Sequence, residues 1–526
     1  MPIDDIRTKE LKDIIRNSFR VRKNHDPIYV ELSNNLDRIS SPQHQLLFGR
    51  RGSGKSCLMV HYLNQAKAQH VFPVYIQADT YKKLTYPDIL IRVLIDINEA
   101  ILNGQSLIKR TFNRKSKLRK SIKELRDLLS SPSHAEVSQG SNDSASETIE
   151  AEIGKKDFGS SKGNVSKASS SSRTAQFKEQ KLELFERQLQ DHKMAIEEGI
   201  KDLSFDRACI LLDDFYLFPR NAHPDIFDYL HRIFRDTDAY LKLATIRHRS
   251  TLSRNHPQTV GVELFQDVEE INLDRMLDDV EATQGYLSKM LTSMGNKVNI
   301  QNVSESYFNP EALEKLTLAS GGVPRDFLNI FVHAIEAAIN EASTEWITPK
   351  NIWKGASRLT YQTKLKHLRE DVDETTPGLE RVFVDLLGFA LNEKKKTVFL
   401  ISQEEAQQFP SEHEIIQQLM DVKLIHIVEQ DTSAASGRAG RYEAYTLDFS
   451  LFMEPRKRNI NIVEFWKVGA DYHKVGIREA PTYSLKRVQE AFAGTNSQTP
   501  EKFMEQLDKE SDKTKSATVA AQESLF

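Results

Sequence analysis

Cysteine is almost absent from this chain, which has only Cys57 and Cys209 among its 526 residues. Each lies inside an apolar segment, so we expect buried free thiols in a reducing compartment rather than a disulfide framework. The chain also lacks an apolar run near the ~20 residues that a membrane helix needs. Its acidic first residues have no apolar core of the kind found in signal peptides. These absences predict a cytoplasmic protein without a membrane segment.

Charge imbalance is also small, with 72 Lys and Arg against 75 Asp and Glu and a net charge of −3. Overall charge therefore argues neither for nor against a nucleic-acid partner. We find no internal repeat, no metal-ligand cluster and no Ser/His/Asp constellation with supporting context. The length is enough for two to four domains and a sizeable core.

A glycine-rich loop follows a short apolar segment at residues 45–48 and precedes an apolar helix. It fits the phosphate-binding pattern G-x-x-x-x-G-K-[ST] at every defined position. Such a loop turns successive backbone N–H groups towards phosphate oxygens at the positive end of a helix. We expect Lys55 to reach the β- and γ-phosphates and the Ser56 hydroxyl to hold Mg²⁺. The expected nucleotide contacts are Gly49, Gly52, Ser53, Gly54, Lys55, Ser56 and Cys57.

Residues 208–214 form a second motif, an apolar run that ends in Asp213 and Asp214. The run predicts a buried parallel strand with carboxylates at its C-terminal edge, where α/β sheets place ligands. Asp213 is expected to hold Mg²⁺, directly or through water, and Asp214 to polarise the attacking water. Taken alone, the motif is also compatible with a core strand that runs into an acidic loop.

The segment 105–203 is an insertion before this strand. Helical spacing of apolar residues predicts helices at 107–129 and 177–203, and the polar stretch 131–175 between them indicates disorder. We interpret the insertion as an antiparallel helical hairpin that stands off the core. Its first helix has a basic face that either binds a phosphate backbone or is a solvated surface. This face comprises Lys109, Arg110, Arg114, Lys115, Lys117, Arg119, Lys120, Lys123 and Arg126.

Residues 241–247 predict another strand, near whose end Thr245 is well placed to contact the γ-phosphate or the attacking water. Four nearby arginines are candidates for neutralising charge on the nucleotide of a neighbouring subunit, which would imply a homo-oligomer. For each of them the alternative is a surface or ion-pair arginine. They are Arg232, Arg235, Arg247 and Arg249.

Residues 275–357 contain helical patterns only. Before the third apolar run stands a Gly-Gly-Val-Pro-Arg sequence, in which Gly321 and Gly322 end one helix and Pro324 begins the next. Arg325 then lies at a helix N-terminus, where a cation is unfavourable for the helix dipole. This position favours a functional role for Arg325.

These motifs, spread over residues 20–455, together resemble an AAA+ ATPase, most closely the origin-recognition initiator branch. The resemblance implies an α/β fold with a parallel sheet, an all-α lid and a C-terminal winged helix, with ATP and Mg²⁺ as cofactors. It implies that Thr245 is the first sensor and Arg325 the second. The family usually has Asp-Glu where this chain has Asp213-Asp214. The shorter carboxylate predicts slow hydrolysis.

The winged-helix candidate is less suited to DNA than the resemblance suggests. Its expected recognition helix, 411–422, carries Glu412, Glu414 and Asp421 but no Lys or Arg, a poor fit to a phosphate-lined groove. Contact with DNA and contact with a protein both remain open for this domain. The expected segments are N-terminal lead-in helices (1–45), the ATPase core (46–272, with insertion 105–203 and disordered tip 131–175), the helical lid (273–358), the winged helix (375–455), an extension (456–493) and a disordered tail (494–526).

The polar tail ends in Gln522, two spacers, Leu525 and Phe526. This resembles the short peptide by which bacterial DNA enzymes bind the sliding clamp. Glu523 departs from the leucine usual at the second position, which predicts weaker binding. The alternatives are a tail that folds back onto its own chain and a tail without a role.

The leading hypothesis is an ATP-hydrolysing AAA+ protein that acts on double-stranded DNA in replication, mobile-element or genome-defence biology. The alternative is a nucleotide-dependent switch that assembles protein partners, with the winged helix as an interaction module. Salt-dependent affinity for DNA distinguishes the two, because phosphate contacts weaken steeply as salt rises.

Overall fold

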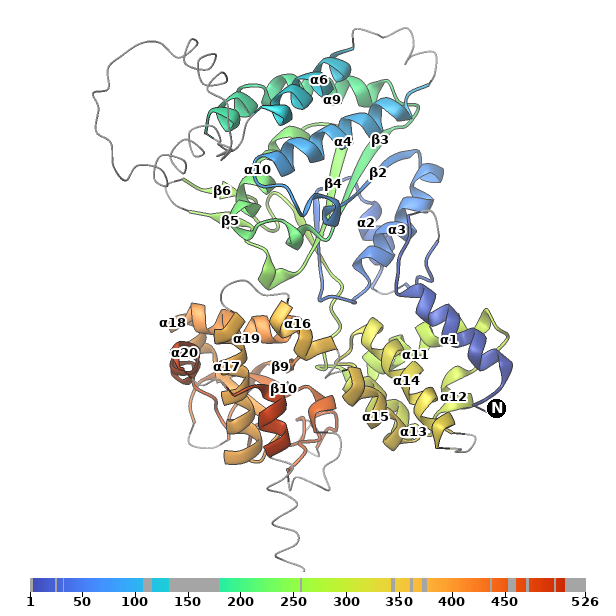
Figure 1. The fold of residues 1–526 in the computed structure, drawn as a ribbon, viewed down its shortest axis with the longest axis vertical. Helices are drawn as coiled ribbons and strands as arrows, with labels where there is room; N and C mark the ends of the chain where they lie inside the picture. The colour runs from blue at the N-terminus through green and yellow to red at the C-terminus, as the bar shows by residue number, and fades with distance from the viewer. Residues whose placement is uncertain are drawn as a thin grey trace, which may run out of the picture.

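The computed structural model describes most of the chain, and the fold is built from three lobes (Figure 1). In Figure 1 the core with the parallel sheet lies at the top, the lid at the lower right and the C-terminal domain at the lower left. The residues described are 3–23, 26–31, 33–106, 116–131, 179–255, 258–341, 346–359, 363–370, 376–435, 438–452, 460–469, 473–495 and 498–506.

The core is a five-stranded parallel sheet in the order β2-β3-β4-β1-β7. The prediction of an α/β fold with a parallel sheet is confirmed. The fifth strand, β7, was not predicted. The strands are β1 (Gln45–Phe48), β2 (Val71–Gln77), β3 (Arg207–Asp213), β4 (Ala239–Thr245) and β7 (Glu269–Asn272).

Helices cover both faces of this sheet. Because side chains alternate along a strand, Leu47 of β1 packs with α2 (Asn35–Ser40) and α3 (Lys55–Ala66) on one face. Leu46 and Phe48 pack on the other face, which α4 (Asp88–Gly104) and α10 (His223–Phe234) cover. Runs that are buried on both faces read as continuous apolar sequence, which is why β1 and β3 were recognisable.

The insertion does not stand off the core, so that prediction is wrong. Its helices α6 (Lys117–Ser130) and α9 (Leu189–Lys201) are antiparallel, since Lys117 pairs with Glu198 and Lys181 donates to the carbonyl of Leu129. Their apolar faces join α4 in the same hydrophobic cluster as the sheet. Apolar side chains gain more free energy when they are buried against α4 than they would gain in a helical pair that stands free in solvent. Residues 107–115 and the expected disordered tip lie outside the described residues, apart from Ser131.

The lid consists of α11 (Val280–Asn296), α12 (Val303–Tyr307), α13 (Pro310–Ala319), α14 (Pro324–Asn340) and α15 (Pro349–Leu359). The N-terminal helix α1 (Ile6–Ser18) belongs to this lobe, because Leu11 and Ile15 lie in the lid's hydrophobic cluster. The Thr8 hydroxyl also lies 2.6 Å from that of Tyr307. Figure 1 shows α1 alongside the lid helices.

The C-terminal domain has the helix–strand–helix–helix–strand–strand order expected of a winged helix, with an antiparallel sheet β8-β10-β9. Its elements are α16 (Leu365–Glu370), α17 (Thr376–Leu387), β8 (Val398–Ser402), α18 (Gln403–Gln408), α19 (Pro410–Asp421), β9 (Ile425–Ser433), β10 (Arg441–Leu447) and α20 (Leu485–Ala493).

The expectation of disorder from residue 494 onward is wrong for residues 498–506. Phe503 and Met504 are buried in the hydrophobic cluster of the C-terminal domain, and Glu501 pairs with Arg369 at 2.6 Å. Two apolar residues in a polar stretch are a weak signal in the sequence, but here they complete a core. Residues 507–526 lie outside the described residues. Within the described part of the chain, no helix is long and apolar enough to cross a membrane.

Candidate nucleotide-binding site

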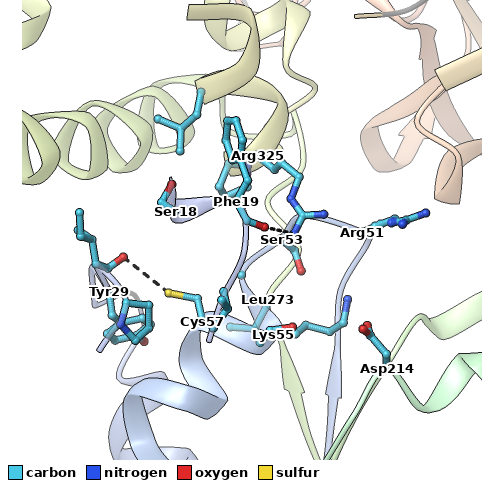
Figure 2. Close-up of a pocket in the computed structure, with 18 of the residues that line it drawn as sticks. Ser18, Phe19, Tyr29, Arg51, Ser53, Lys55, Cys57, Asp214, Leu273 and Arg325 are labelled. Atoms are coloured by element: carbon cyan, nitrogen blue, oxygen red, sulfur yellow. Dashed lines mark hydrogen bonds between the residues drawn. The ribbon is translucent and has the colours of Figure 1, made fainter. Parts of the chain in front are cut away.

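The glycine-rich loop of residues 49–56, the phosphate-binding loop, opens onto a cavity of about 520 Å³. The cavity lies at the junction of the core, the N-terminal segment and the lid (Figure 2). Eight predicted residues line it directly: Gly52, Ser53, Gly54, Lys55, Ser56, Cys57, Asp214 and Arg325. Gly49, which was also predicted, is not among the residues that line the cavity. Residues from segments far apart in sequence therefore converge on one cavity, as expected of a binding site.

The loop has the shape that its glycines permit. Gly52 and Gly54 adopt φ angles of +95° and +105°, which L side chains rarely adopt. At Gly49 a Cβ atom would lie 2.3 Å from the Ser53 Oγ, so a larger residue there would displace the Ser53 side chain. Lys55 is buried at the start of α3, and its Nζ donates to the carbonyl of Gly49 at 2.6 Å. Burial lowers the pKa of Lys55, and a phosphate would supply the compensating negative charge.

The polar groups around the loop fit a phosphate. The Ser53 Oγ is buried and has no hydrogen-bond partner among the described residues. The first N–H groups of α3 have no intrahelical acceptor, because a helix leaves its first turn unsatisfied. An anion at this position would accept from both, with the helix dipole favouring it.

The two aspartates play different structural roles at the end of β3. Asp213 is buried; its Oδ2 accepts from the Tyr75 hydroxyl at 2.8 Å and its Oδ1 from the Asp214 N–H at 2.9 Å. Asp214 has a left-handed backbone (φ +55°) and turns its carboxylate into the cavity, opposite Lys55 (Figure 2). Burial, and next the charge of Asp213, raise the pKa of Asp214. Asp214 is thus the carboxylate that the cavity exposes.

A magnesium site at this edge would draw on few protein ligands. The described residues contain no group of three or more His, Cys, Asp or Glu side chains placed to hold a metal. Mg²⁺ is usually held by one or two carboxylates together with waters and substrate phosphates. The Ser56 hydroxyl and Asp213 are the residues of this chain that would hold it.

The two predicted sensors differ in placement. Thr245 ends β4 next to Phe48 of β1, but it is fully buried and its hydroxyl pairs with that of Ser250 instead of lining the cavity. Arg325 does line the cavity, at the start of α14. Its backbone N–H donates to the Gly52 carbonyl at 3.3 Å, and its guanidinium to that of Phe19 at 3.4 Å (Figure 2).

No sequence pattern indicated the apolar half of the cavity. Phe19 comes from the segment after α1, and Leu273 from the segment after β7. Near Tyr29, whose ring stacks on His61 with centroids 4.8 Å apart, the Cys57 thiol donates to the Ile28 carbonyl at 3.6 Å. Burial raises the pKa of Cys57 to about 12, so the thiol stays protonated. The remaining apolar lining residues include Ile28, Val30, Tyr286, Met290, Met294 and Leu328.

The four arginines considered for action on a neighbouring subunit all have partners within the chain, Arg235 through Asp236 at 3.9 Å. Arg232 pairs with Glu186 and Asp228, and Arg247 pairs with Glu270 while its guanidinium lies 4.2 Å from the Phe48 ring centroid. Arg249 lies over the Tyr216 ring at 5.7 Å. Arg235 is the most exposed of the four, at 67% of its side chain.

The described part of the basic insertion face is partly neutralised. Lys117 pairs with Glu198, Lys120 with Glu124 and Arg126 with Glu99. Lys109, Arg110, Arg114 and Lys115 lie outside the described residues, as do the clamp-like residues Gln522, Leu525 and Phe526.

Comparison with known proteins finds likeness only among solved structures. No family model matches the chain, and no curated protein matches it. The chain is similar in fold to the ORC1 protein of Aeropyrum pernix, solved in complex with DNA, at 13% identity over 82% of this chain and 96% of that one, with a TM-score of 0.34. It is also similar to the Aeropyrum pernix ORC2 protein in ADPNP–ADP complexes, at 12% identity over 83% and 94% with a TM-score of 0.40. A Walker-type ATPase of Pyrococcus abyssi matches at 13% identity over 82% and 97%, with a TM-score of 0.38. The likeness to these structures is one of fold.

Proposed function

We propose that this chain binds ATP with Mg²⁺ and hydrolyses it. The observation that carries the proposal is the convergence of Lys55, Asp214 and Arg325 on one cavity, beside the unpartnered hydroxyl of Ser53. The cavity has a cationic, hydrogen-bonding half for phosphates and an apolar half between the N-terminal segment and the lid for a base. Nucleotide sites have this division, with a few polar groups fixing orientation against apolar walls.

Each side chain has a role that follows from its place. Lys55 and Arg325 neutralise charge on the terminal phosphates, from the loop and from the lid respectively. Asp214 orients the attacking water, because its carboxylate lines the cavity opposite Lys55. Mg²⁺, when bound by Ser56 and Asp213, withdraws charge from the phosphate oxygens. Phosphoryl transfer needs mainly such positioning and charge stabilisation.

Two substitutions separate binding from turnover. Lys55→Ala removes the phosphate-facing cation, so we expect ATP binding to be lost in a fluorescent-nucleotide titration. Asp214→Asn keeps the shape of the side chain and removes the base, so we expect binding to persist while phosphate release stops. An Asp214→Asn variant that hydrolyses ATP at the wild-type rate would show that this carboxylate has been assigned the wrong role.

Double-stranded DNA is the proposed partner, through the basic face of the insertion. The test is ATP hydrolysis with and without DNA, together with DNA affinity over a range of salt. Replacing Lys115, Lys117, Arg119 and Lys120 by Glu is expected to weaken binding similarly across sequences and to flatten its salt dependence. If the affinity at low salt does not change, this face does not bind DNA and is only a solvated surface.

The alternative, a switch whose winged helix binds protein rather than DNA, is favoured by one observation. Helix α19, in the place of a recognition helix, packs against the core segment Arg247–Arg249, and its Glu414 pairs with Arg220 of the core. The arginines at the connection between β9 and β10, which is the wing of a winged helix, also have partners within the chain. Arg438 donates to the carbonyls of Arg478 and Ala480, and Arg441 pairs with Asp431. The surfaces by which a winged helix reads DNA are thus occupied within this chain.

The clamp-like tail is a separate part of the proposal. A peptide of residues 510–526 is expected to bind purified bacterial sliding clamp. The same peptide with Leu525→Ala and Phe526→Ala should not bind, because the apolar pair would fill the pocket. Equal binding by both peptides, or binding by neither, ends this idea.

A further inference from the structure

The C-terminal domain contacts the phosphate-binding loop directly, through Arg50. This loop arginine is only 4% exposed and points away from the nucleotide cavity. Its guanidinium donates to the Arg275 carbonyl at 2.7 Å, to the Gly321 carbonyl at 3.1 Å and to the Asp274 carboxylate at 3.2 Å. Its Nη1 lies 3.1 Å from the Nδ1 of His426, in strand β9 of the C-terminal domain. One side chain of the loop therefore joins the core, the lid and the C-terminal domain.

His426 passes this contact on to buried charges of its own domain. Its Nε2 lies 2.7 Å from Asp448, and Lys364 lies 2.5 Å from the same carboxylate oxygen. Because a guanidinium can only donate and a carboxylate only accept, the ring accepts at Nδ1 and donates at Nε2. Burial lowers the pKa of His426 to about 4, so the ring is neutral in this relay. Arg50, His426, Asp448 and Lys364 thus alternate donor and acceptor across the domain junction.

Lys423, in the turn before β9, makes a second connection. Its Nζ lies 2.9 and 2.8 Å from the two carboxylate oxygens of Asp326, the residue after Arg325 in α14. It also donates to the Arg51 carbonyl in the phosphate-binding loop at 3.3 Å. Lys423 and Asp326 are 6% and 3% exposed. A single ammonium thus holds the loop and the arginine-bearing end of the lid helix against each other.

The approach of the C-terminal domain is close enough to require a specific backbone. A Cβ at Gly321, whose φ is +58°, would lie 2.0 Å from the His426 ring. Apolar residues of the same volume are often at least as stable as a buried ionic cluster. Stability alone therefore does not explain these directional contacts, by which Lys423 and His426 reach the phosphate-binding loop and the start of α14.

We propose that the C-terminal domain completes the nucleotide site, with Lys423 and His426 acting as positioning residues for the phosphate-binding loop and Arg325. The inference rests on the proposed ATPase function, and it adds that the position of the C-terminal domain controls ATP turnover. When the C-terminal domain is seated, the loop and Arg325 are held in the geometry that hydrolysis needs. When the domain moves away from the loop, that geometry relaxes and turnover falls. Neither residue touches the nucleotide cavity, and no motif marks them in the sequence.

The test replaces the buried pair by apolar groups in the full-length protein. Lys423→Met alone leaves the buried Asp326 carboxylate without its cationic partner and should destabilise the fold. Lys423→Met with Asp326→Leu leaves no charge behind, so stability should recover. If the pair positions the site, ATP turnover does not recover. We expect kcat to stay about ten- to a hundredfold below wild type, with KM changed by no more than roughly threefold.

Lys474→Met is the matched control. Lys474 also bridges the C-terminal domain and the lid, donating to the carbonyls of Val428 and Asp278, but it does not reach the phosphate-binding loop. Its kcat should equal that of wild type. The positioning role is overturned if the double variant turns over ATP at the wild-type rate, or if Lys474→Met loses as much activity. A wild-type protein that neither binds nor hydrolyses ATP would instead overturn the proposed function, and this inference with it.

Discussion

The C-terminal domain has two interfaces of opposite character. Towards the lid it is apolar: Leu277, Val280 and Leu318 of the lid region belong to the same hydrophobic cluster as the domain's own core. The second interface, at the phosphate-binding loop and the start of α14, is ionic and hydrogen-bonded: Lys423 pairs with Asp326 and donates to the Arg51 carbonyl, and the neutral His426 ring accepts from Arg50. Apolar burial is strong and non-directional, whereas buried ionic contacts depend on geometry and are costly when one partner is lost. The apolar contacts therefore join the C-terminal domain and the lid into one block, and the polar contacts set the position of that block against the phosphate-binding loop.

The apolar interface should carry the larger share of stability. Leu318 is fully buried in the shared cluster, so Leu318→Ala leaves a cavity and should lower the free energy of unfolding by about 2–5 kcal/mol. Leu184→Ala is the control: that side chain is 51% exposed, and the change should stay within about 0.5 kcal/mol. Denaturant unfolding measures both. Equal effects would mean that the shared cluster does not hold the block together.

The ionic interface should break at Gly321. Gly321→Ala forces a left-handed backbone on alanine and drives its Cβ into the His426 ring, so we expect a loss of about 1–3 kcal/mol. Gly285→Ala, inside helix α11 with nothing within 4 Å of the added Cβ, should instead stabilise by about 0.5–1 kcal/mol. The same denaturant unfolding compares them. A neutral Gly321→Ala would mean that His426 does not need this close approach.

Asp421, at the end of α19 on the ionic side, sharpens the comparison through pH. Its Oδ2 is buried without a hydrogen-bond partner among the described residues, and burial, with Asp274 nearby, raises its pKa from 3.8 to about 8. Between these values the folded protein holds a proton that the unfolded chain releases, so stability falls as pH rises. The Asp421→Asn variant has no carboxyl group to bind this proton, so its stability does not have this dependence on pH. Between pH 6 and pH 7 the advantage of the variant in unfolding free energy should grow by up to about 1.4 kcal/mol, and it should level off above pH 8. An advantage that does not change with pH would contradict the raised pKa.

Local patterns predicted the phosphate-binding half of the site. The glycines around Lys55 and the apolar run that ends in Asp213 and Asp214 each specify a turn or a strand edge within a few residues, so sequence alone places them. Arg325 was found because a cation at a helix start conflicts with the helix dipole. Strand β7 was missed because only Ile271 of its four residues is buried, and pairing with β1 rather than its own sequence makes it a strand.

Long-range contacts were beyond prediction for a different reason. Phe19, Tyr29, Leu273 and Met290 reach the same cavity from four segments, and nothing local distinguishes them from other apolar residues. Lys423 and His426 are isolated polar residues in a turn and a strand. Their role comes only from the approach of two domains.

Hydrogen–deuterium exchange of residues 421–428, with and without ATP and Mg²⁺, tests most directly whether the C-terminal domain and the nucleotide site form one unit. This segment leans on the phosphate-binding loop, so a nucleotide that orders the loop should slow its amide exchange in the wild-type protein. Lys55→Ala should show no such change, because it does not bind the nucleotide. Wild-type exchange in this segment that is unchanged or faster, while ATP is bound, would contradict the claim that the C-terminal domain and the nucleotide site form one unit.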